Sequence, residues 1–127
     1  MVRRILRTAL AGLLLLGLGA APARAGDDEV RREGPCSGRS DWEMRVKLDD
    51  GAFRVRWRVD SGVPGQTWRM RLFHDGDRIA AGTRTTNADG EATLNLRGVP
   101  NHQGPDTFTG RARNPNSGET CAGQATF

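Results

Sequence analysis

The sequence contains few of the residues that most often build catalytic and metal sites. It has two cysteines, Cys36 and Cys121, and two histidines, His74 and His102, among 127 residues. The cysteines do not form the CxxC spacing typical of zinc and redox sites, and both histidines lie in segments expected to be loops. A glycine-rich phosphate loop and a twelve-residue calcium loop are also missing. The sequence therefore predicts no metal site and no cofactor.

Long hydrophobic runs are absent after the N-terminal segment. Residues 1–25 combine a basic start, an apolar run over 9–21 and the small-residue exit Ala23-Arg24-Ala25, which are the features of a secretory signal peptide. The apolar run of about thirteen residues is too short to cross a membrane as a helix. We expect general secretion with cleavage after Ala25, and a secreted, extracellular mature chain that does not contact the membrane.

The excess of positive charge is confined to the same N-terminal segment. The whole chain has 19 Lys and Arg residues against 15 Asp and Glu residues. Four of the basic residues and none of the acidic ones lie in residues 1–25, so the mature chain has 15 of each sign. The net charge therefore gives no argument for binding to nucleic acid, and export argues against such a partner.

Residues 26–127 are sufficient for one small domain. Two cysteines near opposite ends of a domain are expected to pair in an oxidising compartment, so we predict a Cys36–Cys121 disulfide, which would stabilise the domain by about 4–5 kcal/mol. Residues 26–41 are charged and rich in turn-forming residues. We expect them to form a loose N-terminal arm held only at Cys36, followed by a single domain over 42–127.

The clearest structural pattern is a β-hairpin at the start of that domain. Two runs of alternating apolar and charged residues, 42–48 and 53–59, flank Asp50-Gly51, a favoured pair for a two-residue type I′ turn. Counting outward from that turn places an apolar residue opposite an apolar residue at every step, beginning with Leu48 and Phe53. A slip of one residue would set apolar residues against charged ones throughout, so the register is well specified.

Four later segments show the same alternation, and they are 68–72, 92–96, 107–113 and 121–127. They are separated by stretches rich in Gly, Pro, Asn and Asp, and no window has an apolar stripe of helical period. The sequence therefore predicts an all-β protein, an antiparallel β-sandwich of six to seven strands with one disulfide.

Part of this pattern resembles a known family. The segment TTNADGEATL at 85–94 resembles the "T-x-x-x-G-x-A-x-hydrophobic" stretch that leads into a mid-domain strand of bacterial immunoglobulin-like domains, and GPDTF at 104–108 and RARN at 111–114 are similar to their next strand. The chain is also similar to small secreted proteins of high-GC actinobacteria, in keeping with its Arg-rich, Lys-poor composition. The resemblance implies an immunoglobulin-like sandwich over 42–127 in an extracellular setting. It transfers no functional residue, because such domains have many roles.

The outward positions of the predicted hairpin are mostly basic. They are Arg45, Lys47, Arg54, Arg56 and Arg58, with Glu43 as the exception. One interpretation is a face that binds an anionic cell-envelope polymer, since guanidinium groups suit phosphate and carboxylate. The other is a solvated sheet face whose long arginine stems cover the backbone. Carboxylate partners for these arginines would argue against the first interpretation.

The tryptophans and aspartates favour structural roles. Trp42, Trp57 and Trp68 fall on the inward side of their strands, so we expect them in the core rather than stacked on sugar rings. Most aspartates lie at predicted turns, where the side chain makes local hydrogen bonds, and we interpret them as turn formers rather than calcium ligands.

The sequence has no recognisable catalytic arrangement. The serines lie in loops without a nucleophile elbow, and His74 beside Asp75 is the one local His–Asp pair. We therefore expect a non-enzymatic, monomeric binding module whose ligand is an extracellular protein or an anionic polymer. Two alternatives stay open: an enzyme inhibitor or effector that presents loop 98–106 or 114–119, and a small hydrolase built around His74 or His102.

Overall fold

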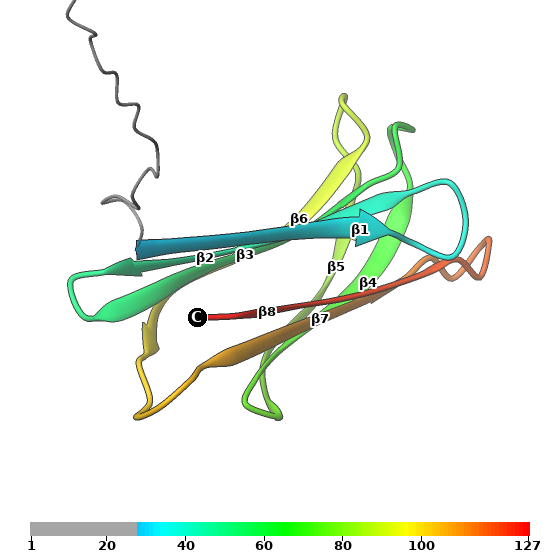
Figure 1. Ribbon diagram of the computed structural model, residues 1–127. Helices are drawn as coiled ribbons and strands as arrows, with labels where there is room; N and C mark the ends of the chain where they lie inside the picture. The colour runs from blue at the N-terminus through cyan, green and yellow to red at the C-terminus, as the bar shows by residue number, and fades with distance from the viewer. Residues whose placement is uncertain (1–27) are drawn as a thin grey trace, which may run out of the picture.

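The chain folds into two antiparallel β-sheets packed face to face (Figure 1). The computed structural model describes residues 28–127, so the expected signal peptide over 1–25 lies outside the described residues. The strands are β1 (Glu29–Pro35), β2 (Asp41–Asp49), β3 (Ala52–Asp60), β4 (Thr67–His74), β5 (Asp77–Thr85), β6 (Glu91–Pro100), β7 (Thr107–Arg113) and β8 (Thr120–Thr126). The predicted all-β sandwich with one disulfide is confirmed, with eight strands rather than six to seven.

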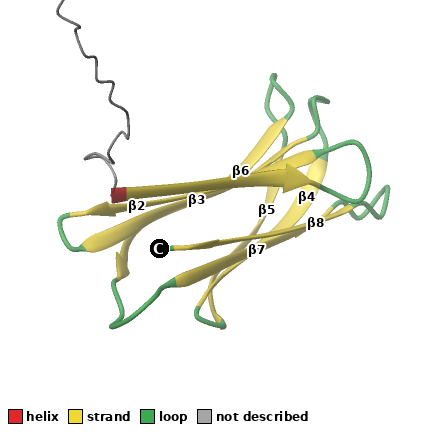
Figure 2. Ribbon diagram, viewed as in Figure 1, coloured by secondary structure: helices red, strands yellow, loops and turns green. Residues whose placement is uncertain are grey.

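Each sheet has four strands. The first sheet has the order β1-β2-β3-β6 and the second has the order β5-β4-β7-β8. The chain passes between the sheets after β3, after β5 and after β6, so the pairs β3–β6 and β4–β7 join strands that are not consecutive in the sequence. Most of the connecting loops therefore gather at the two ends of the sandwich (Figure 2). Within residues 28–127 we find no helix that is long and apolar enough to cross a membrane.

The predicted hairpin has the expected register. Leu48 pairs with Phe53, and the apolar residues of β2 and β3 then face one another along the whole ladder. Asp50 and Gly51 have φ values of 56° and 81°, the left-handed conformation that a type I′ turn requires at both positions. The register prediction is confirmed, because only this pairing buries one complete side of both strands.

Strands β1 and β5 were not predicted. Glu29–Pro35 pairs with β2 along its whole length, which corrects the expectation of an N-terminal arm held only at Cys36. β5 pairs with β4 at the edge of the other sheet. Both are edge strands whose residues are mostly exposed or half-buried. Because neither strand buries a full face, neither needs the alternation by which strands are recognised in a sequence.

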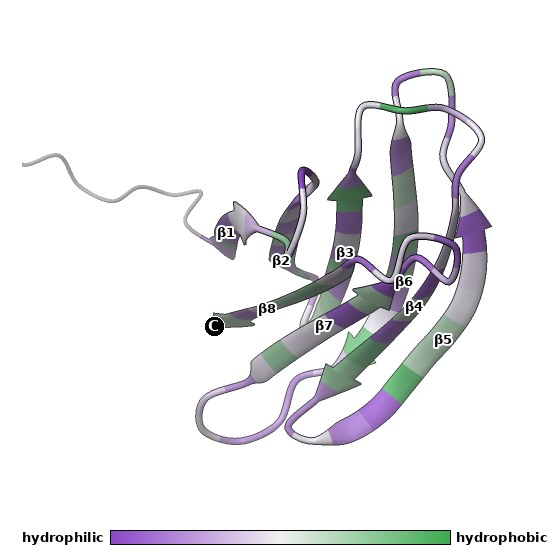
Figure 3. Cartoon of the chain, turned by 90° about the vertical axis from the view of Figure 1, so that its right-hand side faces the viewer, coloured by the Kyte–Doolittle hydropathy of each residue, from purple (hydrophilic) through white to green (hydrophobic). Residues whose placement is uncertain are grey.

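The core lies between the sheets, where hydrophobic residues alternate with hydrophilic ones along the strands (Figure 3). Trp57 and Trp68 are fully buried, and Trp42 is half-buried with its ring centroid 5.7 Å from that of Trp57, so the tryptophan prediction is confirmed. Two glycines of the opposite sheet make room for these rings. A Cβ atom at Gly110 would overlap the Trp57 indole, and one at Gly123 would lie 2.5 Å from Trp42 Cε3.

The predicted disulfide closes one end of the sandwich. Cys36 follows β1 and bonds to Cys121 of β8, so the bond joins the first sheet to the second. Glu119 strengthens this corner, because its carboxylate accepts hydrogen bonds from the backbone N–H groups of Gly38 (3.0 Å) and Ser40 (2.8 Å) and from the Ser40 hydroxyl (2.9 Å). The N-terminal strand is therefore attached both by backbone pairing and by this corner.

We predict that Gly110→Ala lowers the free energy of unfolding by about 1–3 kcal/mol, because the added methyl group must displace a fully buried indole. Gly82→Ala is the matched control: its methyl group would meet only the flexible end of the Arg84 side chain. Urea denaturation measures the free energy of unfolding of both variants. The comparison requires that the variants and the unaltered chain have the same m-value. Equal effects of the two substitutions would contradict this account of the inter-sheet packing.

Candidate functional site

The hairpin face, which consists of Arg45, Lys47, Arg54, Arg56 and Arg58, lies on the outer side of the first sheet. Three of its arginines have carboxylate partners. The Arg45 Nε atom lies 3.4 Å from Glu29, the Arg54 Nε atom lies 3.0 Å from Asp49, and Arg58 lies 3.4 Å from Glu91. Much of the positive charge on this face is therefore neutralised locally.

Glu43 is the centre of this neutralisation. Its side chain is 4% exposed and lies 2.6 Å from Arg31 and 3.6 Å from Arg58. Lys47 and Arg56 form no ion pair with any of the residues that the structure describes. The face is thus a mixed surface, and its pairing of acids with bases weakens the interpretation as an anion-binding site.

A second basic surface lies on the outer side of the second sheet. Arg69 and Arg71 of β4 stand directly opposite Arg113 and Arg111 of β7, and all four side chains are exposed. We call these four residues the arginine lattice. Adjacent strands lie about 4.8 Å apart and alternate residues of a strand about 7 Å apart, so the four stems leave the sheet from one compact patch.

Carboxylates are missing around the arginine lattice. Its register neighbours on the flanking strands are Ala81, Thr83, Thr120 and Ala122. Within residues 28–127, none of the four arginines forms an ion pair. A shallow depression of about 360 Å³ lies between them and β5. Like charges directly opposite each other on a sheet are destabilising, so the patch holds unfavourable electrostatic energy that an anion would relieve.

Part of the arginine lattice could be predicted from the sequence. The alternation of arginines in 68–72 and 107–113 placed them on outward positions, but nothing in the sequence showed that β4 and β7 are neighbours. That adjacency arises from the crossing connections between the sheets. The hairpin face could be predicted from the sequence because its two strands are consecutive in the chain.

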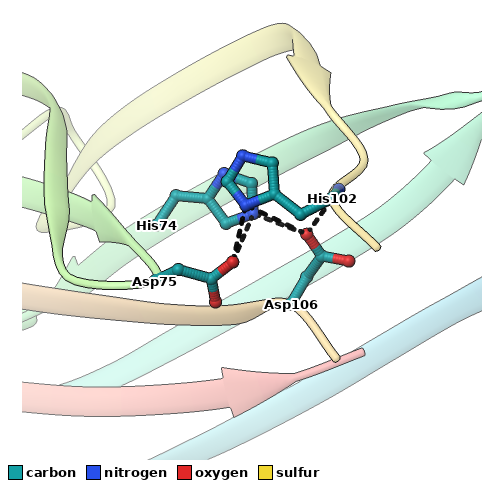
Figure 4. A group of neighbouring side chains, drawn as sticks. All are labelled: His74, Asp75, His102 and Asp106. Carbon is teal, nitrogen blue, oxygen red and sulfur yellow. Dashed lines mark hydrogen bonds and ion pairs between the residues drawn. The ribbon is translucent and has the colours of Figure 1, made fainter. Parts of the chain in front are cut away.

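A different group of polar residues (Figure 4) lies at the end of β7 that is away from the disulfide-bonded Cys121. His74 ends β4, Asp75 is the first residue of the β4–β5 turn, and His102 and Asp106 belong to the loop before β7. We call these four residues the His/Asp cluster. One ring nitrogen from each histidine and one carboxylate oxygen from each aspartate all lie within 4.8 Å of one another. His74 Nε2 donates to Asp106 Oδ1 at 2.7 Å, and His102 Nδ1 donates to Asp75 Oδ2 at 2.6 Å.

The buried half of the cluster packs into the aromatic core. The His74 and Asp106 side chains are each 2% exposed. The His74 ring lies between two parallel rings, with centroid distances of 4.4 Å to Phe108 and 4.0 Å to His102. His74 is thus enclosed on both faces, which makes it a poor general base for a substrate in solution, whereas the His102 side chain is 44% exposed.

The cluster is anchored by backbone hydrogen bonds. The Thr107 N–H donates to Asp75 Oδ1 at 2.8 Å, and the His102 N–H donates to Asp106 Oδ1 at 3.0 Å. The Thr107 hydrogen bond, and then the hydrogen bond from His102, hold the pKa of Asp75 below its usual value. Asp75 therefore remains a carboxylate at a lower pH than an unperturbed aspartate does.

Sequence reasoning missed this convergence. It identified the neighbouring pair His74 and Asp75 but treated His102 and Asp106 as loop residues. The usable signal was Asp75-Gly76, a second Asp-Gly turn whose φ values of 48° and 92° match those at Asp50-Gly51. That turn sets the end of β4, but the return of loop 101–106 to it is a tertiary contact.

The two loops proposed for an inhibitor are both braced. The first three residues of 98–106 continue β6 to Pro100, and its remainder joins the His/Asp cluster. Segment 114–119 is folded around Asn114, whose side-chain oxygen accepts hydrogen bonds from the N–H groups of Asn116 (2.9 Å) and Ser117 (3.2 Å).

Comparisons with protein-family models, with curated proteins and with solved structures found no match to this chain. Functional inference therefore depends on the chemistry of these side chains.

We predict that Arg69→Gln/Arg113→Gln raises the free energy of unfolding by about 0.2–1 kcal/mol, because it removes a like-charge pair and keeps most of each aliphatic stem. Urea unfolding at low ionic strength measures the gain, which should shrink as salt screens the charges. Arg54→Gln, which loses the ion pair with Asp49, is the control and should give no gain. A double variant that is less stable than the unaltered chain would contradict the claim that Arg69 and Arg113 repel each other.

Proposed function

We propose that this protein is a secreted, non-enzymatic binding module that holds an anionic cell-envelope polymer on the arginine lattice. The observation that supports this most directly is the juxtaposition of four exposed arginines with no carboxylate partner among the described residues. The proposal keeps the ligand class expected from the sequence and moves its binding surface from the first sheet to the second.

The geometry of the lattice suits a repeating anion. Each guanidinium group can donate two parallel hydrogen bonds to a phosphate or carboxylate group. Four such groups rising from two adjacent strands can engage consecutive charges along one extended polymer. Thr83 and Thr120 flank the lattice on the neighbouring strands and offer hydroxyl groups to the polar parts of such a chain. Arg71 also lies over the Phe73 ring, with its guanidinium carbon 5.9 Å from the ring centroid.

The distribution of charge supports a local site. The expected mature chain has equal numbers of acidic and basic residues, so it has little long-range attraction for polyanions. On the first sheet, acids and bases interleave, as the contacts of Glu43 and Glu29 show. Binding should therefore depend on which arginines are present rather than on the total charge.

Secretion is part of the proposal. The Cys36–Cys121 disulfide is compatible with an extracellular location, because such bonds persist in oxidising compartments. The resemblance to bacterial immunoglobulin-like domains and the signal-peptide features of residues 1–25 agree with that location.

We predict that Arg71→Glu/Arg111→Glu weakens binding to an immobilised polyphosphodiester or polyuronate by at least about tenfold, since hydrogen bonds to charged groups contribute about 1.5–3 kcal/mol each. Retention on the two polymers, compared with a neutral polysaccharide, measures the effect and shows whether phosphate or carboxylate is preferred. Binding by the unaltered protein should weaken as salt rises from about 0.1 M to about 1 M.

The matched control is Arg54→Glu/Arg56→Glu on the first sheet, which changes the total charge by the same amount. We expect it to retain most of the binding, and circular dichroism should show that both variants keep the β fold. Equal losses in the two variants would show that total charge rather than the arginine lattice determines binding. Salt-independent binding to a protein partner through loop 98–106 or 114–119 would favour the inhibitor alternative instead.

A further inference from the structure

We propose that the His/Asp cluster is a binding site for a divalent transition-metal ion, with Zn²⁺ as the ion that best fits its ligands. The site would use His74 Nε2, His102 Nδ1, Asp75 Oδ2 and Asp106 Oδ1 (Figure 4). This inference departs from the sequence-based expectation of no metal, and it is independent of polymer binding on the arginine lattice.

The ligand set determines the class of ion. Two imidazole nitrogens with two carboxylate oxygens suit zinc and its first-row neighbours, whereas calcium and magnesium prefer sites made wholly of oxygen atoms. Four donors match the tetrahedral coordination of zinc.

The spacing of the four atoms is close to what such an ion requires. Ligand atoms about 2.0–2.2 Å from a tetrahedral centre lie about 3.4 Å from one another. In the cluster, His74 Nε2 lies 3.6 Å from Asp75 Oδ2, and His102 Nδ1 lies 3.9 Å from Asp106 Oδ1. The two hydrogen-bonded pairs, at 2.7 Å and 2.6 Å, are shorter. A central ion in place of the two hydrogen-bonding protons would lengthen the two hydrogen-bond distances slightly. It would also shorten the distances of 3.6 Å and 3.9 Å.

The carboxylates are already held in position. Asp75 Oδ1 is held by the Thr107 N–H, which leaves Oδ2 free to face the histidines. The His102 N–H holds Asp106 Oδ1, and the backbone of Asp106 pairs with that of Phe127 through both of its polar groups. Such hydrogen bonds orient metal ligands and reduce the entropy lost on binding.

Charge supplies a further argument. The cluster brings two carboxylates together, and Asp106 is buried, where an uncompensated negative charge is unfavourable. Two carboxylates and two neutral imidazoles have a formal charge that one divalent cation cancels. On binding, the protons that now lie on His74 Nε2 and His102 Nδ1 would move to the other nitrogen of each ring, which leaves both imidazoles neutral and both ligating nitrogens free.

One side chain has to move. The two imidazole rings are stacked at an interplanar angle of 10°, so their in-plane lone pairs do not converge on a single point. The His102 side chain is 44% exposed and lies in a loop, so it can tilt, while His74 is fixed by Phe108. The bound ion would fasten loop 101–106 to the β4–β5 turn, which indicates a structural role.

The test uses the purified, untagged chain with its disulfide formed and its metal removed by a chelator. We expect calorimetric titration with Zn²⁺ to give one ion per chain, and Co²⁺ to give the visible absorption of a tetrahedral complex. Zn²⁺ should raise the thermal unfolding midpoint by several degrees, because only the folded chain assembles the site. Calcium should have no such effect.

Two ligand variants and one control variant test whether these residues bind the ion. His102→Ala and Asp75→Asn alter exposed or half-buried ligands and should each weaken Zn²⁺ binding at least about 100-fold. Asp50→Asn changes the same position of the matching turn in the first sheet and should bind like the unaltered chain. Absence of binding, or equal binding by all variants, would overturn the proposal. In a third outcome, the ligand variants are less stable than the unaltered chain, but Zn²⁺ does not stabilise the unaltered chain. That result would show that the cluster only forms hydrogen bonds, and it would also overturn the proposal.

Discussion

The packing of two indole rings against two glycines sets the distance and alignment of the two sheets. Trp57 fills the space that the missing side chain of Gly110 leaves, and Trp42 does the same at Gly123. Trp57 Nε1 also donates a hydrogen bond to the Arg111 carbonyl oxygen at 3.1 Å, so a residue at the centre of one sheet is fastened to β7 of the other. Because close-packed cores leave few alternative arrangements, this contact also fixes the outward direction of the arginines on β7.

The charges of the protein are divided between its two outer faces. On the first sheet, carboxylates lie among the arginines, and Glu43 and Glu29 pair with arginines on the neighbouring strands. On the second sheet, the arginine lattice faces solvent beside alanine and threonine neighbours. The expected mature chain, with its balanced total charge, thus keeps one strongly basic patch. The electrostatic cost of that patch is offset elsewhere by the core and the disulfide.

The second sheet is fastened at both ends of its β7–β8 pair. Cys121 is opposite Ala112 near the end of β7, where the disulfide joins it to the first sheet. At the other end, Asp106 precedes β7 and its backbone pairs with Phe127, which follows β8. The Phe127 ring contacts Phe53 of the first sheet, with ring centroids 4.9 Å apart. A covalent bond and a polar cluster backed by aromatic rings therefore hold the same ladder, and the arginine lattice lies at its disulfide end, where Arg111 and Arg113 flank Ala112.

The sequence by itself was enough to predict the hairpin of residues 42–59, whose strands each bury one complete face and are joined by a short local turn. Residues 42–59 specify their hairpin because Asp50-Gly51 fixes the turn and one register alone matches apolar with apolar. The pairing of Cys36 with Cys121 followed from there being two cysteines in a chain that is expected to be exported. Strands β1 and β5 escaped prediction because, unlike the edge strands β6 and β8, they bury no complete face and so show no alternation of apolar residues. Only the tertiary structure decided that Arg69 stands opposite Arg113 and that His102 returns to His74, because these contacts join segments whose separation in sequence leaves no local signal of their proximity.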